Sequence, residues 1–119
     1  YQPKIDLRTG RVVGCEALVR WDHPQRGLLM PESFIPTLEA RGLMVPLGEW
    51  TLRSACRDLA GWRHDGIAIG HVAVNMSAQQ FRAPGLVTLI VDLVDEFGLI
   101  VEIDKEIVIA TVRQAVMPG

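Results

Sequence analysis

The stretch 12–21 (VVGCEALVRW) constrains the fold most strongly, because it has the pattern of a buried strand. It is mainly apolar, carries β-branched residues near each end, and is bounded by Gly10 and Pro24. Alternate side chains of a strand point to the same face of a sheet. One face of this strand is wholly apolar and consists of Cys15, Ala17, Val19 and Trp21. The stretch is therefore expected to lie in the middle of a packed sheet.

The opposite face of the same strand carries two charges, Glu16 and Arg20. They are about 13 Å apart at ~3.3 Å per residue, which is too far for a direct ion pair. An unpartnered buried charge is costly, so each side chain needs a partner of its own. That partner is either a metal or an anion, which indicates a binding site, or an opposite charge on a neighbouring strand.

Composition limits the classes of protein that this chain can represent. Its 119 residues suffice for one domain with a hydrophobic core, and a net charge of −2 gives no basic surface for nucleic acid or a membrane. No apolar run approaches the ~20 residues of a membrane span. Cys15 and Cys56 are expected to be reduced core residues of a cytoplasmic protein. Because Tyr1 replaces a starting Met, the chain is expected to be part of a longer one.

Strand and helix patterns alternate along the chain. Alternation of this kind predicts an α/β layer with parallel strands, either covered on both faces or closed into a barrel. The amount of chain corresponds to about half of a TIM-like barrel of ~250 residues. Strands are expected over 1–7, 12–21 and 71–77, and helices over 31–41, 48–63 and 84–97.

Asn75 is a polar side chain near the carboxyl end of the second buried strand, 71–77. Catalytic and binding residues of α/β folds gather at the carboxyl ends of their strands. We therefore expect Glu16 and Asn75 to lie close together on neighbouring strands, facing the inside of a half-barrel. The alternative is that Asn75 caps the segment that follows it.

Several short motifs occur in a fixed order along residues 1–98. They are Tyr1-Gln2-Pro3, Thr9-Gly10, Gly14-Cys15-Glu16-Ala17-Leu18-Val19-Arg20-Trp21, Pro31-x-x-Phe34-Ile35-Pro36, Leu47-Gly48, Val74-Asn75-Met76-Ser77 and Gln80-Phe81. Together they resemble the EAL domain family, of which Glu16-Ala17-Leu18 is the signature. The resemblance implies the N-terminal half of a modified TIM barrel. The mouth of that barrel, at the carboxyl ends of its strands, hydrolyses cyclic di-GMP to pGpG with Mg²⁺ or Mn²⁺.

The resemblance also implies a role for individual residues. Glu16 is similar to the first metal-ligating carboxylate of the family, and Asn75 to the amide ligand on the next strand. Arg20 resembles the arginine that holds a phosphate of the ligand, while Gln2 and Leu18 resemble ligand-contacting positions. These roles agree with general chemistry, because hard divalent ions prefer oxygen ligands and the guanidinium fork suits a phosphodiester.

Residues 99–119 depart from the family pattern and are expected to be a divergent or truncated tail. The family continues with Glu-x-Thr-Glu, a paired-aspartate strand and a lysine strand. Here Glu102 is the candidate third metal ligand, whereas Lys105 stands where the second glutamate is expected. The run Ile107-Val108-Ile109 suits a strand or a helix, and the sequence leaves both open.

The resemblance implies two possible functions. The first is a metal-dependent cyclic di-GMP phosphodiesterase of which this chain is an incomplete, inactive copy. The second is a non-catalytic remnant that binds cyclic di-GMP or another protein. Full family members are usually cytoplasmic modules of bacterial signalling proteins, often linked to a sensor or diguanylate cyclase domain. An open half-sheet exposes edges and apolar surface, so the chain is also expected to form a homodimer, to exchange elements or to be partly molten.

Overall fold

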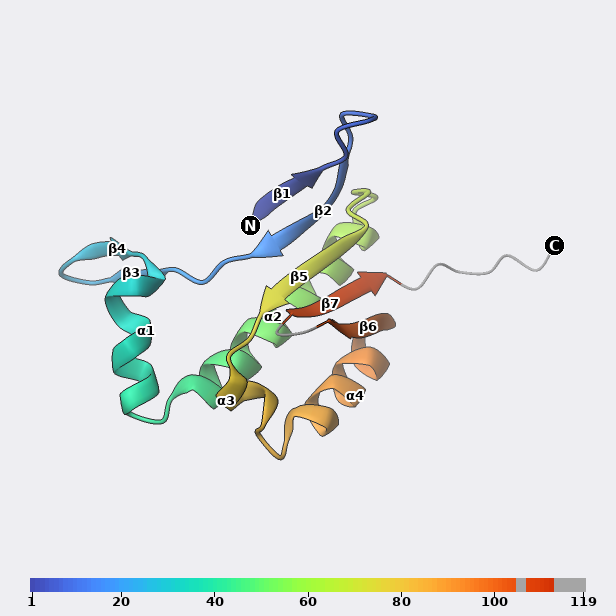
Figure 1. Cartoon of the computed structure of the whole chain (residues 1–119). Coiled ribbons are helices and arrows are strands. Elements are labelled where there is room, and N and C mark those ends of the chain that lie inside the picture. Colours follow the sequence, from blue (N-terminus) through green and yellow to red (C-terminus); the bar gives the residue numbers. More distant parts are fainter. Residues whose placement is uncertain (105–106, 113–119) are drawn as a thin grey trace.

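The computed structural model describes residues 1–104 and 107–112, which form a mixed α/β fold (Figure 1). Strands and helices alternate through most of the chain, as the sequence predicts. The elements are β1 (Gln2–Ile5), β2 (Val12–Ala17), β3 (Trp21–His23), β4 (Gly27–Leu29), α1 (Pro31–Ala40), α2 (Met44–His64), β5 (His71–Asn75), α3 (Ala78–Phe81), α4 (Leu86–Phe97), β6 (Leu99–Asp104) and β7 (Ile107–Val112).

The main sheet has five strands in the order β1-β2-β5-β7-β6. β2 and β5 are parallel, with Cys15, Glu16 and Ala17 opposite residues 72, 73 and 74. They are connected through α2, which is the crossover expected of a barrel fold. β1 is antiparallel to β2, and β7 is antiparallel to both β5 and β6. The expected parallel layer is thus limited to the β2–β5 pair.

The structure resolves the question that the sequence left open at 107–109. This segment belongs to strand β7, which pairs with β5 from residue 107 to residue 111. A run of β-branched residues packs well on a pleated surface, and the unpaired edge of β5 supplies hydrogen-bonding partners for it. The described part of the tail is therefore a β-hairpin placed against β5.

The central strand is shorter than the sequence predicts. β2 ends at Ala17, and Trp21 begins a separate two-stranded hairpin, β3–β4. The indole of Trp21 packs edge-on against Phe34 of α1, with ring centroids 5.9 Å apart. Trp21 thus contacts α1 rather than the main sheet, although it stays 43% exposed, and residues 18–20 form a connection.

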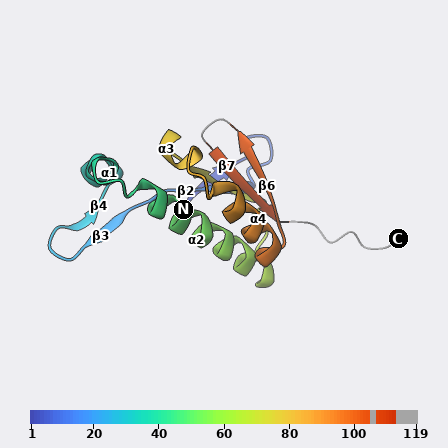
Figure 2. The same cartoon turned by 90° about the horizontal axis from the view of Figure 1, so that it is seen from below.

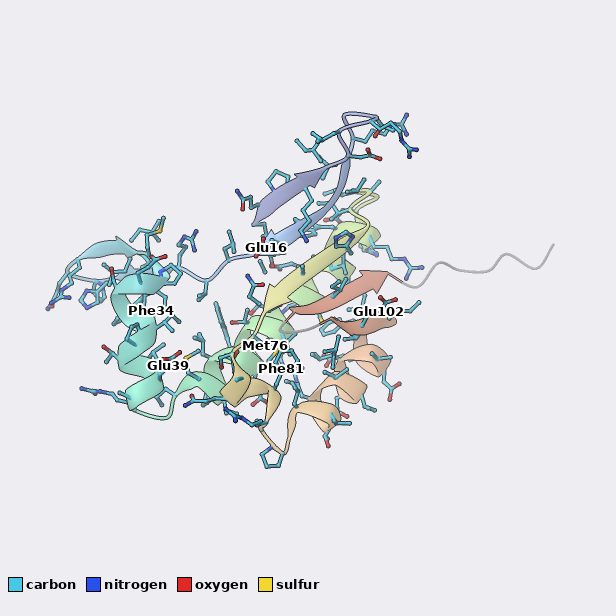
Figure 3. The ribbon with its side chains drawn as sticks, viewed as in Figure 1. Glu16, Phe34, Glu39, Met76, Phe81 and Glu102 are labelled. Carbon is cyan, nitrogen blue, oxygen red and sulfur yellow. The ribbon has the colours of Figure 1, made fainter. Side chains whose placement is uncertain are left out.

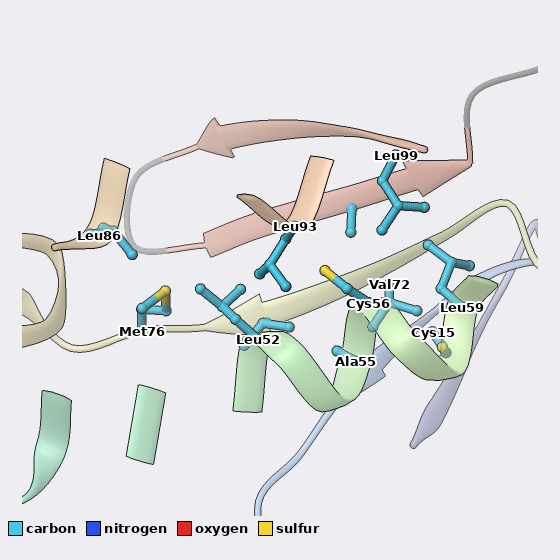
Figure 4. Close-up of a cluster of buried hydrophobic side chains, with 12 residues drawn as sticks. Cys15, Leu52, Ala55, Cys56, Leu59, Val72, Met76, Leu86, Leu93 and Leu99 are labelled. Carbon is cyan, nitrogen blue, oxygen red and sulfur yellow. The ribbon is translucent and has the colours of Figure 1, made fainter. Parts of the chain in front are cut away.

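Helices α2 and α4 lie on the same side of the main sheet (Figure 2). Between them and the sheet is one hydrophobic core, built from side chains of α2, α4 and the facing strand residues (Figure 4). Burial of these groups is the main source of stability for a chain of this size. The core contains Cys15, Leu52, Ala55, Cys56, Leu59, Val72, Val74, Met76, Leu86, Leu93, Leu99 and Ala110. Within residues 1–104 and 107–112, no helix has the length and apolar character needed to span a membrane.

Gly14 is required by a side chain on the neighbouring strand. The imidazole of His71 lies directly over this glycine, and a methyl group there would lie only 2.5 Å from Cε1 of the ring. Real side chains do not approach so closely, so the His71 ring or one of the two strands would have to move.

Replacing Gly14 with Ala is expected to lower the free energy of unfolding by about 1–3 kcal/mol because of this overlap. Gly61 lies within α2 with open space around it, so Gly61→Ala is expected to stabilise the protein by about 0.5–1 kcal/mol. Urea unfolding followed by circular dichroism measures both values. Adding His71→Ala to the Gly14→Ala variant should restore stability, and a Gly14→Ala variant as stable as the original chain would contradict the interpretation.

Both cysteines are free and buried in the core, as the sequence predicts. Burial raises the pKa of Cys56 to about 11, although Arg53 nearby opposes the shift, and burial also raises the pKa of Cys15. Since only the thiolate reacts, Cys56 should be alkylated by iodoacetamide at pH 8 at least ~100-fold more slowly in the folded protein than in urea. Mass spectrometry of the separate peptides measures the rate at each cysteine. Equal rates in the two states would show that the core is open.

Candidate functional site

Glu16 and Asn75 meet at the carboxyl end of the β2–β5 pair. The parallel register places Glu16 beside Ala73. Asn75 is two residues further along β5, so its side chain lies on the same face of the sheet as that of Glu16. The Asn75 amide donates a hydrogen bond from Nδ2 to Oε1 of Glu16, with 2.5 Å between the two atoms. The expectation that these two side chains lie close together is therefore confirmed.

The alternative that Asn75 caps the next segment is wrong. That task falls to Ser77, whose Oγ accepts a hydrogen bond from the backbone N–H of Gln80 at 3.2 Å. The side chain of Asn75 is exposed and remains available to Glu16. The partner of Glu16 in the described structure is thus a neutral amide.

Leu18 and Arg20 lie in the connection after β2, where they line a cleft of about 320 Å³ together with Asn75. We call this the carboxyl-end cleft. Most of its wall is apolar, and its polar groups come from four segments of the chain. It is lined by Ala17, Leu18, Val19, Arg20, Pro31, Ile35, Met44, Leu47, Gly48, Thr51, Asn75, Met76, Ser77 and Gln80. An apolar pocket with a few converging polar groups is the usual form of a small-molecule site.

Arg20 is exposed, and its Nη1 donates to the carbonyl oxygen of Val19 at 2.7 Å. The remaining guanidinium N–H groups can therefore bind an anion in the cleft. Gln2 of β1 is paired with Glu16 in the sheet, so its exposed side chain lies beside the Glu16–Asn75 pair. The structure thus places Leu18, Arg20 and Asn75 on the cleft. Glu16 bonds to Asn75, and Gln2 is paired with Glu16 in the sheet, but neither Gln2 nor Glu16 lines the cleft.

Glu102 is separated from the other five. It lies on β6 opposite Ile109 of β7, which in turn lies opposite Ala73 of β5. Three strand spacings therefore separate the backbones of Glu102 and Glu16, or about 14 Å at ~4.8 Å per spacing. Figure 3 shows the two labelled residues on separate parts of the sheet. The cause is β7, which occupies the position next to β5.

The donor atoms near Glu16 supply part of a metal site. Glu16 offers carboxylate oxygens and Asn75 an amide oxygen, both suited to Mg²⁺ or Mn²⁺. In the described ranges 1–104 and 107–112, however, no three His, Cys, Asp or Glu residues are grouped so that they could hold a metal ion. A two-metal centre needs several carboxylates to hold ions a few ångströms apart. The residues that the structure describes therefore do not make up such a centre.

Gln80 has a structural role that the sequence analysis did not assign. Its side chain is 5% exposed, donates from Nε2 to the carbonyl oxygen of Met44 at 2.7 Å, and accepts from the backbone N–H of Ser77 at 2.6 Å. It thereby ties the segment after Asn75 to the beginning of α2. The signal was present in the sequence, because Ser-x-x-Gln is the pattern of a capping box.

Gln80→Ala is expected to destabilise the protein by about 1–3 kcal/mol, because it removes the bond to the Met44 carbonyl and leaves the Ser77 N–H without its side-chain acceptor. Gln79 is the matched control, since it is exposed on the same short helix, and Gln79→Ala should change stability by less than about 0.5 kcal/mol. Thermal and urea unfolding of the two variants test the difference. Equal stabilities would contradict the bridging role of Gln80.

The sheet and the crossover helix are those of a partial TIM-like barrel, with polar residues at the carboxyl ends of its parallel strands. A sequence model of the EAL domain matches residues 1–117. The chain belongs to the EAL domain family.

Known proteins with similar sequence and structure agree with this assignment. Over 87 residues the chain is 49% identical to the bifunctional diguanylate cyclase/cyclic di-GMP phosphodiesterase MucR of Pseudomonas aeruginosa. This alignment covers 73% of this chain and 13% of MucR. The structure of the PaMucR phosphodiesterase in complex with c-di-GMP matches with a TM-score of 0.76 and 44% identity over 82% of this chain and 40% of that one. The EAL enzyme Bd1971, with cAMP and cyclic di-GMP bound, gives a TM-score of 0.72 at 31% identity over 82% of this chain and 28% of that one. The chain thus spans a minor part of each relative.

Proposed function

We propose that this chain binds cyclic di-GMP in the carboxyl-end cleft and does not hydrolyse it without further carboxylates. The observation that carries the proposal is the convergence of Leu18, Arg20 and Asn75 on one cleft. Two relatives with the same fold, PaMucR and Bd1971, are described as complexes with this dinucleotide. In this proposal residues 1–98 are the N-terminal part of an EAL domain, and residues 99–119 are a divergent or truncated tail.

Each residue is suited by its chemistry to contact a different part of the ligand. The Arg20 guanidinium binds a phosphodiester through paired N–H groups, a geometry that a lysine does not reproduce. Leu18 and the apolar wall contact a purine face, while the exposed Gln2 amide, outside the cleft on β1, offers both donors and acceptors. None of these contacts requires a metal ion.

The catalytic part of the family chemistry needs more than these residues. Bound Mg²⁺ or Mn²⁺ would acidify a water molecule and neutralise charge on the phosphate. Glu16 and Asn75 would hold one side of such an ion, and the family resemblance adds Glu102 as a further ligand. The position of Glu102 on β6, with β7 between it and β5, argues against joint coordination with Glu16.

The setting of the chain forms part of the same proposal. MucR is named as both a diguanylate cyclase and a cyclic di-GMP phosphodiesterase, and the part similar to this chain is 13% of its length. We propose that this chain acts beside sensor or diguanylate cyclase domains in a cytoplasmic bacterial signalling protein.

Isothermal titration with cyclic di-GMP tests the binding proposal. Arg20→Ala should weaken binding at least ~10-fold, because it removes a charge-assisted contact worth about 1.5–3 kcal/mol. Arg63 near the end of α2 is exposed and outside the cleft, so Arg63→Ala should leave the affinity unchanged. Equal losses in both variants would indicate general electrostatic attraction, and no heat with the original chain would reject the proposal.

Hydrolysis is tested separately by incubating the chain with cyclic di-GMP and Mg²⁺ or Mn²⁺ and following pGpG by chromatography. No turnover above the buffer rate is expected, because too few carboxylates converge on Glu16. Glu16→Ala is the control for contaminating enzymes. Turnover that disappears in Glu16→Ala would show that a working centre assembles in another way.

A further inference from the structure

A groove of about 360 Å³ lies between the N-terminal halves of α2 and α4, which pack side by side (Figure 2). We call it the helix groove. Its walls come from these two helices, and its floor comes from the segment that connects β5 to α4. All its lining residues fall between Val45 and Asp92, so its shape depends on neither the inner face of the sheet nor the tail.

The floor of the helix groove is apolar and held in place. Met76 and Leu86 are 5% and 8% exposed, and Leu89 is half-buried beside them. Gln80 completes the floor, and the two hydrogen bonds described above fix its amide. The groove is therefore formed before any ligand arrives, and its volume is within the usual range of small-molecule sites. An aliphatic ligand would leave water on entering it.

Negative charge along the rim of the helix groove lacks a partner. Arg53 of α2 donates from Nη1 to Oε2 of Glu96 on α4 at 3.0 Å, which joins the two helices. Glu49 and Asp92 precede this pair by four residues on their helices, so they lie one turn before it on the same faces. Both are exposed and line the groove. Neither forms an ion pair within residues 1–104 and 107–112.

We propose that the helix groove binds a small molecule that carries a primary ammonium group on an aliphatic chain. The ammonium bridges Glu49 and Asp92 as Arg53 bridges the helices one turn later, and the chain lies over Met76 and Leu86. Hydrogen bonds from an ammonium to carboxylates are charge-assisted, whereas an anionic ligand would be repelled. A divalent metal ion fits less well, because it prefers six or more oxygen ligands and the groove offers two carboxylates above an apolar floor.

Titration of the full chain with n-hexylamine at pH 7, followed by NMR of the backbone amides, tests the proposal. Hexylamine should bind at least ~5-fold more tightly than hexan-1-ol or hexanoate, which have the same chain length but no positive charge. The amide signals of groove residues such as Glu49 and Leu89 should shift most. Nα-acetyl-lysine amide carries the same ammonium on a shorter chain and should bind more weakly than hexylamine.

Conservative variants separate the proposed contact from general attraction. The double variant Glu49→Gln/Asp92→Asn should bind hexylamine and hexan-1-ol within ~2-fold of each other, and its retained binding of hexan-1-ol shows that the groove is intact. The matched control is Glu39→Gln/Asp95→Asn, because both side chains are exposed outside the groove. This control should keep the full preference for hexylamine.

Several results would overturn the proposal. They are the absence of shifts at groove residues, an undiminished preference for hexylamine in Glu49→Gln/Asp92→Asn, and an equal loss of that preference in the control. Displacement of hexylamine by Mg²⁺ at constant ionic strength would indicate a metal site instead. Tighter binding of the lysine derivative would assign the groove to a lysine of a partner protein. The helix groove shares Met76 and Gln80 with the carboxyl-end cleft, but the test uses no nucleotide, so it is independent of the cyclic di-GMP proposal.

Discussion

Parallel pairing of β2 with β5 determines the position of both the core and the candidate site. The three paired positions from Cys15 to Ala17 direct alternate side chains to opposite faces of the sheet. Cys15 and Val72 enter the core beneath α2, while Glu16 and Asn75 emerge on the other side, joined by a hydrogen bond. Because a strand alternates strictly, a shift of one residue would bury Glu16 and expose Cys15. Core packing and site geometry are thus fixed by the same register.

Local sequence patterns predict much of this arrangement. Alternation in two apolar strands was enough to place Glu16 near Asn75, and helical spacing was enough to find α2 and α4. The end of β2 was not predictable in this way, because Trp21 suits a strand as well as it suits packing against Phe34. The tail shows the same limit more clearly. Ile107 belongs to a strand because it pairs with Asn75 on the edge of β5, and Asn75 is 32 residues earlier in the sequence.

Some residues of the candidate site lie on regular strands and others in an irregular connection, so the sequence predicts the positions of the first group better than those of the second. Glu16, Asn75 and Gln2 are positioned by regular strands, and their neighbours follow from register. Leu18 and Arg20 lie in an irregular connection, and only the folded structure shows that they line a cleft with Asn75. Gln80 is hidden from simple hydrophobic patterns because it is a polar residue in a buried position. Its bridge to Met44 nevertheless holds one wall of that cleft.

The position of β7 has a consequence for how this sheet can grow. A parallel barrel is completed by adding the next strand to the free edge of β5, but five residues of β5 are already paired with β7. The backbone donors and acceptors on that side are therefore satisfied within the chain. A separate polypeptide carrying the later strands of an EAL barrel would first have to displace the β6–β7 hairpin. Complementation between the two pieces would then be a strand-exchange reaction, with a rate set by opening of the hairpin rather than by encounter of the partners.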